Sequence, residues 1–294
     1  IREKLQTKAK DLGLWLLDTP VEYGGQGLGL LAMVVVWEEL ARTIAMPPRG
    51  PLIFGPDVRP ILFTLPDSQK EKYLLPVLRG EKKTAFAQSE PDAGADPGSM
   101  RTTAVRQGDH YIINGYKRWI TNGGRADFFQ LVAATDRAKG SRGGLSMFLV
   151  DADTPGVTVV RPVPTMVGDA PYELAFDNVK VPVENLIGKE GDGMKNAQSW
   201  ITSGRLYQAC RGLGVAKRCL DMAASYSKQR VTFGQPLSDR QAIQFKIADS
   251  YMEHKMVQLM VYNLAARTEA GLAQRHESYM VKIAGTELGF RVAD

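Results

Sequence analysis

Cysteine and histidine are scarce in this 294-residue sequence. The two cysteines, Cys210 and Cys219, fall on one predicted helix, where nine residues span about 13 Å, which is too far for a disulfide. We therefore expect a reducing compartment. The three histidines, His110, His254 and His276, are widely spaced. Their spacing predicts neither a metal cluster nor a Ser/His hydrolase, and we expect each of them on the solvated surface.

Long apolar runs are missing as well. No run approaches the roughly 20 residues of a membrane span. The chain opens Ile1-Arg2-Glu3-Lys4, without the apolar core of a signal peptide. It also lacks an initiator methionine and stops at Asp294 inside a helical pattern. We expect no membrane span and no export signal, and we expect both ends of the natural chain to be missing.

The sequence has no massed charge of one sign. Its net charge is +5, from 37 basic and 32 acidic residues, and Lys and Arg occur in short pairs such as Lys82-Lys83. Nucleic-acid binding predicts a basic patch with interleaved aromatic residues, so we expect no nucleic-acid partner. The slight positive excess is compatible with a small, phosphate-rich ligand.

The pattern of apolar residues changes twice along the chain. Residues 1 to 83 are typical of short helices, over Arg2 to Leu14, Leu30 to Ala41 and Asp67 to Leu78. Residues 84 to 187 alternate with period two, and residues 188 to 294 return to helical spacing. With 44% apolar and 23% charged residues, the composition is that of a globular protein with room for two or three subdomains.

The middle segment predicts many short strands separated by turns, which is typical of an antiparallel sheet pair or barrel. The expected strands are Thr84 to Gln88, Thr102 to Arg106, Tyr111 to Asn114, Lys117 to Thr121, Phe128 to Thr135, Leu145 to Val150, Val157 to Val163 and Leu174 to Val181.

The last segment predicts long helices with narrow apolar stripes, as in a helical bundle. One helix runs from about residue 195 to 228, a second starts near 238, and a third starts near 275. The expected stripes are Leu206, Ala209, Leu213, Ala216, Leu220 and Ala223 on the first helix, and Ala248, Met252, Leu259 and Ala266 on the second.

Two segments of the middle region carry the functional signal. In Gly115 to Gly124, period-two alternation predicts that Trp119 and Thr121 point to the same side of an extended strand, which suits a flat heterocycle. About thirty residues earlier, Thr84 to Asp96 supplies a strand and then a Pro/Gly turn with many backbone N–H groups. A lone Trp-x-Thr is usually a half-buried strand, but the two segments occur together and in order.

Together these segments resemble the flavin-binding signatures of the acyl-CoA dehydrogenase family, and the resemblance covers essentially all 294 residues. It implies an α+β fold with an N-terminal helical domain (1–83), a middle antiparallel β domain (84–187) and an incomplete C-terminal helical bundle (188–294). The cofactor would be FAD. With the reducing environment expected above, the protein would be cytoplasmic, or in the mitochondrial matrix if it is eukaryotic.

The resemblance also implies roles for residues near the flavin ring. Phe86, Gln88 and Ser89 would give backbone and hydroxyl contacts to the pyrimidine edge. Trp119 would pack against the ring, and Thr121 would hydrogen-bond near N5. Donors aimed at the ring would stabilise the negative charge that develops when the flavin accepts a hydride. For Phe86 and Trp119 the alternative is plain core packing.

A third motif lies between the two long predicted helices, in Arg230 to Leu237, and is followed by Gln241. By itself it is a basic interhelical loop. It resembles the Arg-x-Thr-Phe-Gly element of the family, in which Arg230 would grip the flavin pyrophosphate, and Thr232 and Phe233 would pack near the adenosine. The family takes this element from the neighbouring subunit, so the resemblance implies a homodimer or homotetramer.

The substrate features match less well. Ala95 stands where the family usually has a serine that contacts the coenzyme A pyrophosphate. Arg205 keeps the family's helix arginine near the substrate cleft, and Ile201 and Thr202 would line the acyl or pantetheine channel. Most members take the catalytic carboxylate from a C-terminal segment, and some from the residue before that arginine, which here is Gly204. We therefore expect the base beyond Asp294.

The function implied is α,β-dehydrogenation of an acyl-CoA thioester to the trans-2-enoyl-CoA, with electrons passed to an electron-transfer flavoprotein. Two alternatives stay open. One is a flavin-dependent oxidase or monooxygenase on the same fold, and the other is a catalytically silent flavin-binding assembly protein. Glu190 and Asp192 lie at a predicted helix start, where we expect them to cap the helix.

Overall fold

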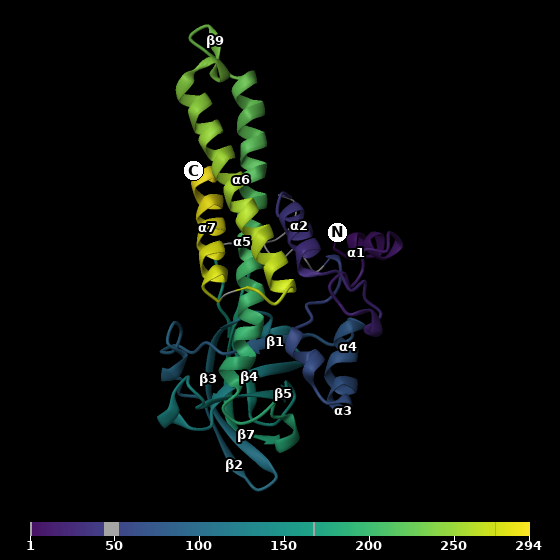
Figure 1. Cartoon of the computed structure of the whole chain (residues 1–294). Helices are drawn as coiled ribbons and strands as arrows, with labels where there is room; N and C mark the ends of the chain where they lie inside the picture. Colours follow the sequence, from purple (N-terminus) through teal and green to yellow (C-terminus); the bar gives the residue numbers. More distant parts are fainter. Residues whose placement is uncertain (1, 44–52, 167, 274) are drawn as a thin grey trace. The chain divides into compact units, whose positions relative to one another are not determined.

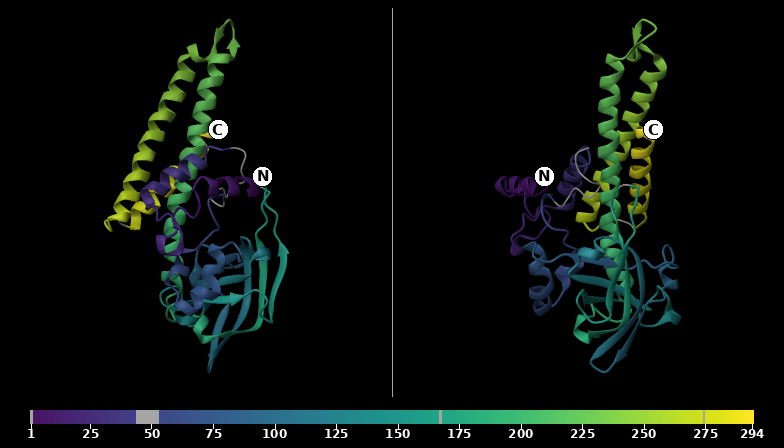
Figure 2. Two further views of the ribbon diagram at one scale, coloured as in Figure 1. Left: turned by 90° about the vertical axis from the view of Figure 1, so that its right-hand side faces the viewer. Right: turned by 180° about the vertical axis from the view of Figure 1, so that it is seen from behind.

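The computed structural model describes residues 2–43, 53–166, 168–273 and 275–294. They form two compact units. The helical unit comprises Ile1–Gly55 and Ile201–Asp294, and the sheet unit comprises Pro56–Trp200. Figure 1 shows both units, and Figure 2 gives two further views.

The sheet unit is built on one seven-stranded sheet with strand order β1-β4-β2-β3-β7-β6, in which β5 pairs with β4. Its strands are β1 (Thr84–Ala87), β2 (Thr103–Gln107), β3 (His110–Ile120), β4 (Phe128–Ala134), β5 (Leu145–Asp151), β6 (Val157–Pro162) and β7 (Tyr172–Pro182).

The predicted strands are confirmed, with two differences. The runs Tyr111 to Asn114 and Lys117 to Thr121 form the single strand β3, which ends at Ile120 and has register shifts against β7 between Ile113 and Gly115 and between Lys117 and Ile120. Most pairings are antiparallel as expected, but β4 pairs in parallel with β1 and, at one position, with β2.

Burial differs between the strands of the sheet. All seven residues of β4 are buried, and β5 is buried over all but its last residue, so both strands are mainly apolar without alternation. The edge strand β6 is exposed over nearly its whole length. Near the start of the unit, the predicted helix Asp67 to Leu78 is present as α3 (Asp67–Gln69), a π-helical turn (Lys70–Leu74) and α4 (Leu75–Leu78).

The helical unit contains five α-helices in its described part, of which α5 begins in the sheet unit. They are α1 (Arg2–Asp11), α2 (Leu30–Leu40), α5 (Gly193–Gln229), α6 (Gln241–Glu269) and α7 (Arg275–Ala293). A hairpin of β8 (Val231–Thr232) and β9 (Gln235–Pro236) joins the C-terminal end of α5 to the N-terminal end of α6 (Figure 1). None of the described helices is long and apolar enough to cross a bilayer.

The predicted stripe on α5 is confirmed as far as Leu220, since Leu206, Ala209, Leu213 and Ala216 are also buried, but Ala223 is exposed.

The predicted stripe on α6 is wrong. Met252 and Leu259 are 57% and 58% exposed, and Ala248 and Ala266 are exposed too. The helix has apolar residues on more than one face, and the buried face is a different one. That face consists of His254, Val257, Val261, Leu264 and Ala265.

Candidate functional site

Backbone hydrogen bonds join the two segments that carry the flavin signature. The Arg118 amide donates to the carbonyl of Ser89 at 2.9 Å. One residue earlier on each segment, Lys117 Nζ donates to the carbonyl of Gln88 at 3.0 Å. Residues 88–89, which follow β1, therefore lie beside residues 117–118 near the end of β3.

Trp119 does not follow the alternation of an extended strand. Its φ of 63° is in the left-handed region, and it lies within the register shift between Lys117 and Ile120. Thr121 lies in the turn after β3. The prediction that period two sends both side chains to one side of a strand is therefore wrong, because the bulge re-aims Trp119. A non-glycine residue held in this region is strained, and such strain clusters at binding sites.

The indole of Trp119 is 49% exposed, and a charged side chain lies against its ring. The Arg118 guanidinium lies 4.8 Å from the Trp119 ring centre, and its Nε lies 3.1 Å from a carboxylate oxygen of the buried Glu173. Hydrogen bonds from Arg161 and Tyr116 lower the pKa of Glu173. The carboxylate thus stays charged and holds Arg118 in place.

A tight turn follows Trp119. Asn122 has a left-handed φ of 62°, and a Cβ at Gly124 would come within 2.3 Å of the Tyr172 ring. The backbone of this turn therefore packs directly on Tyr172, which requires glycine. The strand β3, which ends at this turn and is labelled in Figure 1, lies between β2 and β7 in the strand order.

The residues of β1 and the segment after it offer both an apolar face and an orphan acceptor. The half-buried Phe86 ring lies 5.0 Å from that of Trp200, between centroids. Gln88 Oε1 is buried and has no hydrogen-bond partner among the described residues. An unpaired buried acceptor on one segment and a half-exposed indole on the segment hydrogen-bonded to it suit a flat heterocycle that carries N–H donors, so these residue types fit a flavin ring.

The sequence analysis missed a buried ion pair that underlies both segments. Lys117 is fully buried, and its Nζ lies 2.8 Å from Glu90 Oε1. Glu90 also accepts hydrogen bonds from the backbone amides of Arg101 (2.7 Å) and Thr102 (3.0 Å). The signal was present, because Lys117 shares the period-two positions of the buried Tyr111 and Ile113.

Burial lowers the pKa of Lys117 to about 8, although the Glu90 carboxylate opposes this shift. For Glu90, burial acts to raise the pKa, but the ion pair with Lys117 and the hydrogen bonds outweigh it and the net pKa is lowered. Both groups are therefore charged near neutral pH.

The Arg230 motif forms the β8–β9 hairpin of the helical unit. Its two-residue turn, Phe233 and Gly234, has positive φ at both positions (50° and 79°), as a type I′ turn requires. Phe233 is 98% exposed, and Arg230 is exposed as well. Arg240, which the sequence analysis missed, donates to the Thr232 carbonyl at 2.7 Å and fixes the hairpin. Gln241 is exposed and begins α6.

The residues expected near the substrate lie in two places. Ala95 is exposed in the loop after β1, and Ile201, Thr202 and Arg205 follow one another along α5. The Arg205 guanidinium lies 4.7 Å from the ring centre of Tyr279. A side chain at Gly204 would meet no described atom within 4 Å.

Two expectations about single residues are wrong. Glu190 does not cap a helix, because its carboxylate accepts a hydrogen bond from the Tyr111 hydroxyl at 2.5 Å; burial and this carboxylate raise the pKa of Tyr111 to about 12. His254 is 4% exposed and so is not a surface residue. Among the described residues, no three His, Cys, Asp or Glu side chains are grouped to hold a metal ion.

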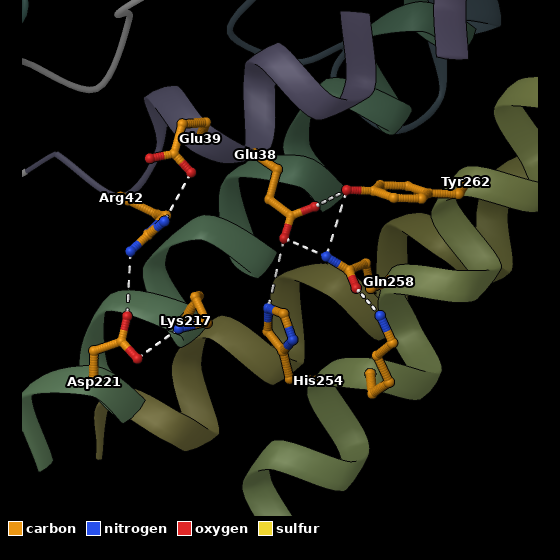
Figure 3. A network of polar contacts seen from close by, with 9 residues as sticks. Glu38, Glu39, Arg42, Lys217, Asp221, His254, Gln258 and Tyr262 are labelled. Carbon is orange, nitrogen blue, oxygen red and sulfur yellow. Dashed lines mark hydrogen bonds and ion pairs between the residues drawn. The ribbon is translucent and has the colours of Figure 1, made fainter. Parts of the chain in front are cut away.

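His254 belongs to a buried polar cluster between α2 and α6 (Figure 3). Glu38 of α2 accepts hydrogen bonds from the Tyr262 hydroxyl and the Gln258 amide, both at 2.8 Å. His254 Nε2 lies 3.8 Å from Glu38 Oε1 and has no hydrogen-bond partner in the part of the chain that the structure describes. His254, Gln258 and Tyr262 are spaced four residues apart on one face of α6.

Comparison with known proteins agrees with this architecture. Three family models match the chain, for the N-terminal (residues 1–81), middle (85–179) and C-terminal (191–294) domains of acyl-CoA dehydrogenase. The 3-(aryl)acrylate reductase of Clostridium sporogenes is 35% identical, over 99% of this chain and 78% of its own length. The caffeyl-CoA reductase-Etf complex subunit CarC of Acetobacterium woodii is 36% identical, over 97% and 76%.

A solved structure is also similar. The butyryl-CoA dehydrogenase of Megasphaera elsdenii superposes with a TM-score of 0.86 at 34% identity, over 99% of this chain and 77% of its own. The predicted fold class and FAD as the cofactor are thereby confirmed. The chain belongs to the acyl-CoA dehydrogenase family, whose members are FAD-dependent oxidoreductases acting on CH–CH bonds.

Proposed function

We propose that the protein oxidises an acyl-CoA thioester to the trans-2-enoyl-CoA and passes the electrons to an electron-transfer flavoprotein. The observation that carries the proposal is the junction between the two segments, where Arg118 N bonds to Ser89 O and the half-exposed Trp119 ring is held in a left-handed backbone. The two hydrogen-bonded segments carry the flat Trp119 ring on one side, and the unpaired Gln88 Oε1 and the Ser89 hydroxyl on the other.

The residues of the junction would hold the flavin ring in three ways. Trp119 would pack on it, the Gln88 side chain would accept from an N–H at its edge, and Ser89 and Thr121 would donate to its carbonyl edge and near N5. FAD, when bound, supplies a two-electron acceptor for the hydrogen that leaves the substrate β-carbon. Fixed donors near the ring favour the charge that develops during this transfer.

The exposed hairpin fits a role in a second subunit. Phe233 is 98% exposed, and Arg240 holds the hairpin rigidly. A rigid tip with an exposed aromatic residue and the exposed Arg230 suits a site on a neighbouring copy, where Arg230 would pair with the FAD pyrophosphate. Thr232, Phe233 and Gln241 would lie near the adenosine. We therefore propose a homodimer or a homotetramer, and a three-domain division at residues 83 and 187.

The acyl substrate would lie along α5. Ile201, Thr202 and Arg205 follow Trp200, which packs on Phe86. We propose that Ile201 and Thr202 line the acyl or pantetheine channel and that Arg205 lies near the substrate cleft. Ala95 would stand at the position where the family contacts the coenzyme A pyrophosphate. We propose none of these residues as the catalytic base, since Gly204, which precedes Arg205, provides no carboxylate.

The test uses the full natural chain. We expect it to bind one FAD per subunit and to lose its visible flavin absorbance when an acyl-CoA such as butyryl-CoA is added without oxygen. Electron-transfer flavoprotein should restore the absorbance. A folded protein that binds no FAD would contradict the proposal, and rapid reoxidation by air would favour an oxidase instead.

Two relatives favour a second candidate, the reverse reaction, since both are named as reductases of acrylate-type or caffeyl-CoA substrates. The same preparation separates the directions. Chemically reduced protein would be reoxidised by an enoyl-CoA or aryl-acrylyl-CoA if reduction is the physiological direction. The reaction with the larger kcat/KM identifies that direction.

A further inference from the structure

We propose that Lys117 and Glu90 act as a positioning pair for the flavin ring, an inference that rests on the proposed flavin site. Neither side chain would touch the cofactor. The pair would set the spacing between the two segments that do, by fixing the Gln88 carbonyl on one side and the backbone before Trp119 on the other.

The location of the pair is the first argument. Lys117 is the last residue in regular register with β7 before the shift that gives Trp119 its left-handed backbone. Gln88, whose carbonyl accepts from Lys117, is the first residue after β1 ends at Ala87. The ammonium group thus joins the residue that follows β1 to the point in β3 at which the regular register with β7 is interrupted.

Glu90 connects the ion pair to a third segment, the residues before β2. Its carboxylate accepts the amides of Arg101 and Thr102, which directly precede β2, while one oxygen accepts from Lys117. The Thr102 carbonyl in turn accepts from the Ala134 amide at the end of β4, at 2.8 Å. The loop after β1 therefore cannot shift relative to β3 without breaking several hydrogen bonds made by one buried carboxylate.

Energetics argue that stability alone does not explain the pair. Replacing a buried ion pair by apolar residues of similar volume is often neutral or stabilising, because two charges no longer have to be removed from water. What an apolar pair cannot supply is a donor at a fixed point for the Gln88 carbonyl. The ion pair specifies one arrangement of the two segments. It thereby sets the positions of Ser89 and Trp119, which lie close to the pair in the sequence.

The experiment compares FAD binding with stability in matched variants. The double variant Lys117→Met/Glu90→Gln removes both charges together, so no unpaired charge is buried. We expect its FAD dissociation constant to rise about tenfold, the effect of losing one hydrogen bond from a charged donor. We also expect a changed visible flavin spectrum and a shifted flavin reduction potential.

The control is Lys72→Met, which breaks the ion pair with Asp151 (2.7 Å) elsewhere in the sheet unit. It should change the unfolding midpoint but leave FAD affinity within about twofold.

The outcomes separate this proposal from the proposed function. If the unaltered protein binds no FAD, both fall. If it binds FAD, and the double variant folds and binds equally well with the same spectrum and potential, the positioning pair alone is wrong. Should the double variant not fold, Glu90→Asp carries the test, since it keeps both charges of the pair but shortens the side chain, so that one carboxylate can no longer reach Lys117, Arg101 and Thr102 from the same position. We expect about threefold weaker FAD binding from it, and unchanged binding would overturn the proposal.

Discussion

Two buried glutamates, Glu90 in the sheet unit and Glu38 in the helical unit, are held by different partners. Glu90 is paired with the ammonium of Lys117 and with two backbone amides. Among the residues that the structure describes, the hydrogen-bond donors to Glu38 are the neutral side chains of Tyr262 and Gln258, and His254 lies at 3.8 Å (Figure 3).

The difference teaches how each unit tolerates a buried carboxylate. In the sheet unit the charge is compensated within the pair, so both members have to be kept or removed together. In the helical unit the charge is solvated by side-chain dipoles from α6, and removing one donor leaves others. We therefore expect the sheet unit to respond more strongly to a single substitution, and the helical unit to respond more strongly to pH.

The largest effect is expected from Lys117→Met alone. It leaves the Glu90 carboxylate buried without a cation, and breaking a buried pair in this way costs about 3 to 5 kcal/mol. Urea unfolding of the protein, followed by tryptophan fluorescence to which Trp119 and Trp200 of the sheet unit contribute, measures this loss. The double variant with Glu90→Gln should recover most of it, and a single variant as stable as the double would show that the pair carries no buried charge.

A smaller effect is expected from Glu38→Gln. The amide keeps one acceptor for Tyr262 or Gln258 but loses the charge-assisted bonds, which lowers the free energy of unfolding by about 1 to 3 kcal/mol. The matched control is Glu39→Gln on the same helix. The side chain of Glu39 is 69% exposed in its ion pair with Arg42, so its loss should cost less than about 1 kcal/mol. If both variants lost the same free energy of unfolding, the buried Glu38 cluster would stabilise the protein no more than the surface pair of Glu39 and Arg42.

The smallest effect, and the most selective one, is a dependence on pH. Burial lowers the pKa of His254 from 6.5, although Glu38 opposes it, and Lys217 and Lys255 add to the lowering. The unfolded chain therefore binds more protons than the folded one below pH 6.5, so stability is full above that pH and falls as the pH drops through the window below it.

His254→Leu should flatten this slope below about pH 6.5. The lowered pKa of Glu90 acts in the same direction but only below its ordinary value of 4.5, so the sheet unit should hold its stability to lower pH. Unfolding curves measured at several pH values test both statements. An unchanged slope in His254→Leu would mean that another group titrates.

The sequence predicted most of the fold because short apolar runs separated by turns mark the strands, and long stretches of helical spacing mark the last helices. It failed where tertiary contacts override the local pattern. Trp119 occupies a strand-like position in the sequence, but the bulge against β7 turns its backbone. The buried face of α6 could not be chosen from the pattern, because Met252 and Leu259 make a second apolar face.

The candidate site was also predictable only in part, because part of it depends on a contact between residues distant in the sequence. Segments 84–96 and 115–124 stand out by their residue types, whereas the Lys117–Glu90 pair joins residues that are 27 apart in the sequence. A lysine in a strand is normally read as solvent-facing, because a fully buried one is rare without a partner. Only the structure brings Glu90 to it.

Hydrogen–deuterium exchange with and without FAD tests most directly whether the two segments form one flavin-ring site. The account predicts that bound FAD slows exchange in peptides covering residues 86–90 and 117–122 together. FAD that binds tightly while exchange in both segments stays unchanged, with protection elsewhere in the chain, would contradict it.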